Sequence, residues 1–177
     1  IDNVERGLKY LMEDFCLHLL NSKWTLWYHK SNDTDWSLES YIKLATFSSI
    51  EEFSIVYNNL KPIHVQNSML FVMREGINPI WEDEKNINGG CWSFKVSEST
   101  AQDLWDDLSN YLVTENISSI KDDIVGLSVC LKKNNFSVVK IWNKDNSNNS
   151  LNLLCKDILN KWGLDIIYIA HMPDVEV

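Results

Sequence analysis

Apolar and polar residues alternate along much of the chain, which is the pattern of β-strands that bury one face. The clearest examples are KWTLWYHK at 23–30 and CWSFKV at 91–96, where aromatic residues are common. Similar alternation or short apolar runs predict further strands at 41–47, 68–74, 124–132, 136–143 and 165–171. The dipeptide Asn134-Asn135 between two of them predicts a tight hairpin with positive φ angles.

Other segments place apolar residues three or four positions apart, as an α-helix does. A capping box opens the first of these segments, because Ser48 or Ser49 is followed three positions later by Glu51 or Glu52. The predicted helices span 48–60, 99–115 and 151–163, and a weaker helical pattern at 4–15 contains Gly7.

The order of these elements predicts an α+β fold. Strands come in hairpins, and the helices between them are too widely spaced for strict β-α-β alternation. We therefore expect one mostly antiparallel sheet with three helices on one face and a free, concave binding face. The 177 residues fit a single domain, 1–177, in which 1–17 form an N-terminal extension with helical character.

Composition and charge exclude several classes of protein. The net charge of −9 argues against general binding to the DNA or RNA backbone, although a small anion site is compatible with it. The apolar runs fall far short of the ~20 residues that cross a bilayer, and the start lacks a signal-peptide pattern. The four cysteines are far apart, which predicts neither a zinc site nor a disulfide framework. We expect a cytoplasmic protein.

Catalytic motifs are missing from the sequence. The chain contains no nucleotide-binding glycine loop, no G-x-S-x-G and no H-E-x-x-H, and its four histidines are scattered. The acid pairs Asp106-Asp107 and Asp122-Asp123 are interpreted as solvated faces. A nucleotide hydrolase would need a helix of metal-binding carboxylates, for which no spacing is present. The sequence therefore predicts a binding protein without metal or cofactor.

Tryptophan is unusually abundant, with eight residues in the chain. Trp36 and Trp81 fall in predicted loops at strand ends, where core packing explains an aromatic side chain poorly. Two indoles from neighbouring loops can sandwich a flat ring, more strongly if the ring is cationic. Glu82 can accept two parallel hydrogen bonds from the edge of a guanine. The alternative is that both tryptophans belong to the core and Glu82 is a solvated acid.

The motifs resemble those of one known family. Trp24 and Trp27 in W-x-x-W, FSSIEEFSIVYN at 47–58, GINPIWEDEKNINGGCW at 76–92 and Ile141-Trp142 are similar to the initiation factor 4E family. Members of this family bind the 7-methylguanosine cap of eukaryotic messenger RNA. The resemblance covers about residues 18–171. It implies a curved antiparallel sheet like a cupped hand, with three helices on its convex back.

The resemblance also implies roles for single residues. Trp36 and Trp81 would stack on the methylated base, Glu82 would accept from its N1–H and amino group, and Trp142 would contact the N7-methyl group. The family's structural tryptophans match Trp24, Trp27, Trp92 and Trp105. The phosphate-binding Arg of the family falls on Lys132, and another lysine of the family is replaced by Val138 or Ser137. Lys140 is a further candidate for the cap triphosphate because strand alternation places it on the same face as Trp142, and Lys133 is another.

The partner surface departs from the family pattern. Members recruit a scaffold protein, or inhibitors that compete with it, through an apolar patch on the convex back. Here His18 and Ile50 are retained, but the helix tryptophan is replaced by Ser54 and two apolar positions by Asp106 and Asn110. The resemblance implies a cap-binding protein that promotes translation initiation. The alternative is a repressor or decoy that holds capped messages without recruiting the usual scaffold.

Overall fold

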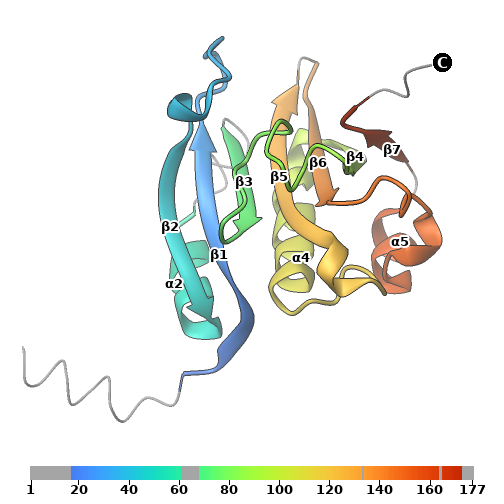
Figure 1. Ribbon diagram of the computed structural model, residues 1–177, viewed down its shortest axis with the longest axis horizontal. Coiled ribbons are helices and arrows are strands. Elements are labelled where there is room, and N and C mark those ends of the chain that lie inside the picture. Colours follow the sequence, from blue (N-terminus) through green and yellow to red (C-terminus); the bar gives the residue numbers. More distant parts are fainter. Residues whose placement is uncertain (1–16, 61–67, 133, 164, 173–177) are drawn as a thin grey trace, which may run out of the picture.

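The structure, a computed structural model, describes residues 17–60, 68–132, 134–163 and 165–172. The predicted helix at 4–15 and Lys133 lie outside these ranges. One sheet runs through the described chain in the order β2-β1-β3-β5-β6-β4-β7, with every neighbouring pair antiparallel (Figure 1). Its strands are β1 (Leu19–His29), β2 (Ile42–Ser49), β3 (Met69–Arg74), β4 (Gly90–Ser97), β5 (Ile124–Lys132), β6 (Phe136–Asn143) and β7 (Ile166–Ala170).

Each predicted strand is present, and the predicted fold class is confirmed. Within the described ranges the α-helices are α2 (Ile50–Asn58), α4 (Ala101–Val113) and α5 (Lys156–Trp162). In Figure 1, α2 and α4 lie behind the curved sheet, and α5 lies beside it near β7. Ile158 of α5 belongs to the same core as the residues of α4 that pack on the sheet, so the opposite face carries no α-helix among the described residues. No helix in the described part of the chain is long and apolar enough to cross a membrane.

Local chemistry sets the helix and turn boundaries. The hydroxyl of Ser49 accepts a hydrogen bond from the Glu52 backbone N–H at 3.1 Å, and the Glu52 carboxylate accepts from the Ser48 N–H at 2.7 Å. The predicted cap is thus confirmed at Ser49, while the Glu52 carboxylate caps the N–H of the preceding residue, Ser48, and not that of Ser49 itself. Asn134 and Asn135 have φ angles of 70° and 60°, as the hairpin prediction requires.

The helix predicted at 151–163 begins later than expected. Leu151–Leu153 form a 3-10 turn, and the α-helix starts only at Lys156. Between them Leu154 is extended and pairs with Ser118, while the Cys155 N–H donates to the carbonyl of Ile117. Long-range pairing therefore overrides the helical pattern in this short stretch.

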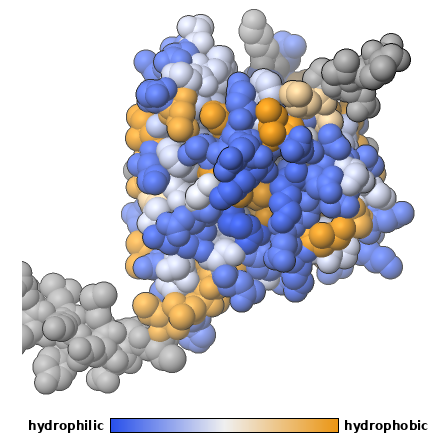
Figure 2. Space-filling model, in the orientation of Figure 1, coloured by the Kyte–Doolittle hydropathy of each residue, from blue (hydrophilic) through white to orange (hydrophobic). Residues whose placement is uncertain are grey.

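The core lies between the sheet and the helices. Trp24, Trp92 and Trp105 are fully buried there, as the resemblance implied. Trp27 is instead half-buried on the opposite face, where the Lys43 ammonium lies 5.1 Å from its ring centroid. Figure 2 shows this opposite face, which is largely hydrophilic, with its apolar side chains in separate patches.

The solvated interpretation is wrong for Asp123. Asp122 is exposed, but Asp123 is 2% exposed and accepts hydrogen bonds from the Asn143 side chain and the Asp145 N–H. Burial raises the pKa of Asp123. Asp106 and Asp107 are half-buried rather than solvated, with Gln102 donating to the former and Lys161 to the latter. Hydrogen bonds to these polar groups make such burial tolerable.

Candidate functional site

The free face of the sheet holds a cavity of about 320 Å³. Alternate residues of β6, namely Val138, Lys140 and Trp142, face into it, because side chains two apart share one face of a strand. Two loops close it from the sides, one carrying Trp36 and the other carrying Trp81 and Glu82. The predicted base-binding and phosphate-binding residues within the described ranges therefore meet in one place: Trp36, Trp81, Glu82, Trp142, Lys132 and Lys140.

Both loop tryptophans are presented to solvent. Trp36 is 52% exposed and Trp81 is 43% exposed, although both are large apolar side chains. The core alternative is therefore wrong for these two residues. One face of Trp36 is covered by His29, whose ring is stacked at 4.5 Å with an interplanar angle of 5°. Its other face remains available to a ligand.

The loop that carries Trp81 and Glu82 is held by its own side chains. The carboxylate of Asp83 accepts hydrogen bonds from the N–H groups of Asn78 and Lys85. The fully buried amide of Asn86 donates to the carbonyls of Asn78 and Ile80 at 2.9 and 2.8 Å. Glu82 and Glu84 are exposed. The acidic run therefore contains residues that fix the loop, such as Asp83, and an exposed carboxylate, Glu82, that lines the cavity.

Replacing Asn86 with alanine should loosen this loop. It removes both hydrogen bonds to the carbonyls of Asn78 and Ile80 and leaves those acceptors without their partner. We expect the free energy of unfolding to fall by about 1–3 kcal/mol. Urea denaturation of this variant and of Asn152→Ala, an exposed control, measures the difference. Equal stability of the two variants would contradict a structural role for the Asn86 amide.

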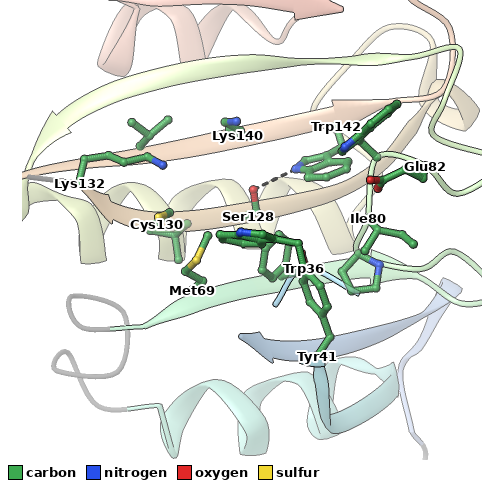
Figure 3. A pocket seen from close by; sticks show the side chains of 15 residues that line it. Trp36, Tyr41, Met69, Ile80, Glu82, Ser128, Cys130, Lys132, Lys140 and Trp142 are labelled. Carbon is green, nitrogen blue, oxygen red and sulfur yellow. Dashed lines mark hydrogen bonds between the residues drawn. The ribbon is translucent and has the colours of Figure 1, made fainter. Parts of the chain in front are cut away.

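Trp142 forms the floor of the cavity. It is only 7% exposed, and its indole N–H donates to the hydroxyl of Ser128 at 2.9 Å (Figure 3). Phe71 and His171 contact its ring at centroid distances of 6.3 and 4.9 Å. Because its only polar group is engaged, Trp142 offers the cavity an apolar ring surface.

The two ends of the cavity differ in charge. In Figure 3, Glu82 lies beside Trp142 at one end, and Lys132 lies at the other end, with Lys140 between them. Burial, with a smaller contribution from the negative charge of Glu82, raises the pKa of Tyr41 to about 12, so this phenol stays neutral. The cavity can therefore orient a ligand that carries hydrogen-bond donors at one end and an anion at the other.

A second hollow of about 260 Å³ adjoins the cavity and contains Cys91 and His171. The two residues approach to 3.9 Å, but burial raises the pKa of the Cys91 thiol to about 12. Burial and the nearby Lys140 lower the pKa of His171 to about 4. A neutral thiol beside a neutral imidazole is no activated nucleophile. The described residues also contain no group of three potential metal ligands.

The predicted partner residues lie on the helical side. Ser54 is exposed on α2, whose first residue, Ile50, is 46% exposed. Asp106 and the exposed Asn110 lie one turn apart on α4, and burial raises the pKa of Asp106. His18 precedes β1 and contacts the Glu51 carboxylate through Nδ1 at 2.6 Å. These positions thus present mainly polar groups, and Ile50 is the one apolar residue among them.

Four residues that matter to the site were not singled out from the sequence: His29, Tyr41, Asn86 and Ser128. His29 supports Trp36, Tyr41 lies near Glu82, Asn86 fixes the Trp81 loop, and Ser128 holds Trp142. The alternation of 23–30 and 124–132 puts His29 and Ser128 on strands, but their neighbours across the sheet are not visible in the pattern. Asn86 could have been suspected as a turn residue within an acidic loop.

Comparisons with known proteins identify similar chains. The family model for eukaryotic initiation factor 4E matches residues 19–171. Translation initiation factor 4E of Eremothecium gossypii is 35% identical over 152 residues, which cover 81% of this chain and 71% of that protein. Its counterpart in Candida albicans is 34% identical over 137 residues, 72% of this chain and 65% of that protein. The chain thus spans about two thirds of the length of these relatives.

A solved structure agrees with the fold. The crystal structure of Ascaris suum eIF4E-3 in complex with an m7G cap superimposes with a TM-score of 0.77 at 26% identity. The match covers 91% of this chain and 94% of that one.

Proposed function

The chain belongs to the eukaryotic initiation factor 4E family, and from this premise we propose that its concave cavity binds the 7-methylguanosine cap of messenger RNA. The observation that carries the proposal is that two exposed indoles, Trp36 and Trp81, and an exposed carboxylate, Glu82, line one cavity. This set of groups matches a flat, cationic base with two parallel donors on one edge. The Ascaris suum relative, by its title, holds an m7G cap.

In the proposed complex the base lies between Trp36 and Trp81. Methylation at N7 makes guanine cationic, and a cation is attracted to the negative face of each indole. Glu82 accepts hydrogen bonds from the guanine N1–H and amino group, which adenine cannot provide. The backbone N–H of Trp81 donates to the guanine O6. The apolar ring of Trp142, whose N–H is engaged by Ser128, contacts the methyl group.

The cap phosphates extend toward the basic end of the cavity in this proposal. Lys132 is exposed there and Lys140 is half-buried, and both line the cavity. Lys133 is adjacent in sequence to Lys132 and lies outside the described residues. A lysine is a point charge without the planar fork of arginine, so it fixes phosphate geometry less strictly.

Replacing Lys132 with alanine should weaken binding of 7-methyl-GTP by about three- to tenfold, because one exposed charge contact is lost. Binding of 7-methylguanosine, which lacks phosphates, should not change. Calorimetric titration at low and at moderate salt measures both ligands, and the loss should shrink as salt rises. Lys156→Ala, which removes a charge from α5 on the helical side, is the matched control. An equal loss for the phosphate-free ligand would contradict the assignment.

We propose a role in translation initiation in the cytoplasm, with cap binding as the activity and no chemical step. Capped messages would be the ligand, and a scaffold factor or a binding protein would be the partner on the helical side. Capture of a capped RNA, compared with the same RNA carrying a 5′ triphosphate, tests the activity. Equal capture of the two RNAs would contradict it, and release of 7-methyl-GDP from the capped RNA would indicate a hydrolase.

A second candidate role is a repressor or decoy. It is favoured by the polar groups at Ser54, Asp106 and Asn110, because interfaces of this kind depend on a few large apolar anchors. A peptide with the scaffold pattern Y-x-x-x-x-L-φ separates the two roles. Tight binding of that peptide would support the initiator role, and no binding at high peptide concentration would support the repressor or decoy.

A further inference from the structure

We propose that Phe136 is a stacking platform for the first nucleotide that follows the cap, so that the message leaves the cavity across the start of β6. The inference rests on the proposed function, since it concerns the RNA that is joined to the cap phosphates. It assigns a ligand to an exposed aromatic side chain that does not itself line the cavity.

Phe136 lies directly beside the basic end of the cavity. It is the first residue of β6, and it pairs with Lys132, the last residue of β5, across the hairpin. The Cβ atoms of directly paired residues in an antiparallel sheet lie about 4.5–5.5 Å apart on one face. Lys132 lines the cavity, so Phe136 shares the concave face with it. Alternation along β6 agrees, because Val138, Lys140 and Trp142 also face the cavity.

The ring of Phe136 is held in place but not covered. It is 40% exposed, and within the described ranges it belongs to neither cluster of packed apolar residues. The ammonium of Lys95, on the neighbouring strand β4, lies 4.3 Å from the centroid of the ring. This cation–π contact occupies one face of the ring and favours a fixed orientation. The other face is left to a flat ligand.

Positive charge accompanies the ring. In the part of the chain that the structure describes, neither Lys132 nor Lys95 forms an ion pair with a carboxylate. Two acids belong to neighbouring segments. Asp165 accepts from the Lys95 N–H through its backbone carbonyl at 3.4 Å, and the Glu98 N–H donates to the carbonyl of Asn135 at 3.0 Å. Both ammonium groups are therefore available to phosphates, which are attracted locally despite the net charge of −9.

The order of these groups matches the order of groups in a capped message. In the proposed complex the methylated base lies between Trp36 and Trp81, and the triphosphate extends past Lys140 to Lys132. Phe136 is the next side chain across the sheet, where the first nucleotide after the triphosphate would arrive. Every base has a π-face, so stacking on this ring accepts any nucleotide at that position. The platform thus suits messages of any sequence.

The test compares 7-methyl-GTP with a capped dinucleotide, 7-methyl-GpppA, by calorimetric titration at constant salt. In Phe136→Ala the affinity for the dinucleotide, relative to that for 7-methyl-GTP, should fall by about five- to 150-fold, as expected for the loss of one stack between a base and an aromatic ring. Phe136→Tyr retains the ring and should keep the wild-type ratio. Binding of 7-methyl-GTP also reports that each variant is folded.

An exposed apolar residue outside the concave face provides the matched control. Leu151 is 41% exposed in the turn before α5, and Leu151→Ala should leave the ratio at its wild-type value. An unchanged ratio in Phe136→Ala, or an equal fall in Leu151→Ala, would overturn the inference while leaving the proposed function intact. Failure of the wild type to bind 7-methyl-GTP would overturn the proposed function itself.

Discussion

Replacing Glu82 with glutamine should weaken binding of 7-methyl-GTP by about two to three orders of magnitude. The carboxylate accepts two hydrogen bonds from the guanine edge in the proposed complex, and charge-assisted bonds are worth about 1.5–3 kcal/mol each. A glutamine amide retains one acceptor but places an N–H₂ group against a second donor. The mismatch leaves one donor of the stacked base without an acceptor, which is why the expected loss is large.

The neighbouring acid provides the matched control for Glu82. Glu84 is exposed and belongs to the same loop, so Glu84→Gln changes the net charge equally without removing the proposed contact. Calorimetric titration of both variants with 7-methyl-GTP measures the difference. Losses of similar size would indicate a general charge effect and would contradict recognition of the guanine edge by Glu82.

Replacing Trp81 with alanine should weaken binding of the same ligand by about 10- to 4000-fold. Stacking on an aromatic side chain contributes about 1–3 kcal/mol per base, and a cationic ring adds roughly 0.5–2 kcal/mol. Trp81 is 43% exposed, so its truncation should destabilise the fold less than truncation of a fully buried tryptophan such as Trp92. Trp36→Ala should behave in the same way, with the added loss of the stack on His29.

Phenylalanine at position 81 provides the graded control. Trp81→Phe retains a flat ring with a weaker attraction for cations, so its affinity should lie between those of the wild type and Trp81→Ala. Thermal unfolding of each variant checks that the fold is intact. An unchanged affinity in Trp81→Ala, with the protein folded, would exclude the sandwich.

The strand and helix patterns predicted the architecture because the two faces of this sheet carry different kinds of side chain. Along β4, for example, Trp92 and Phe94 face the helices while Cys91 and Ser93 face the opposite side, and such alternation is visible in the sequence. The helix cap at Ser49 was equally predictable, since it depends only on residues close in the chain. Sequence patterns therefore predict those features whose interacting residues are close together in the chain.

Predictions failed where distant residues decide the outcome. The late start of α5 follows from the pairing of Leu154 with Ser118. The burial of Asp123 follows from contacts with Asn143 and Asp145. Neither contact has a signal in sequence spacing. From the sequence alone, an acid pair such as Asp122-Asp123 is interpreted as solvent-exposed, because the hydrogen-bond partners that allow Asp123 to be buried are not known.

The candidate site was predictable to a similar extent. Trp36 and Trp81 could be selected because aromatic residues in polar loops are hard to attribute to a core, and the structure brings them to one cavity with Glu82. Lys140 could be placed by its alternation with Trp142 on β6. The support of Trp36 by His29 could not be predicted, because it depends on the path of the loop back over β1.

The central claim is that the cavity selects a guanine made cationic by N7 methylation. Titration of the unmodified protein with 7-methyl-GTP and with GTP, followed by tryptophan fluorescence, tests it most directly. Stacking on Trp36 and Trp81 should quench the fluorescence with 7-methyl-GTP, at an affinity about 10- to 1000-fold higher than for GTP, the difference expected from cation–π attraction at two indole faces. Equal affinity for the two nucleotides would contradict the account.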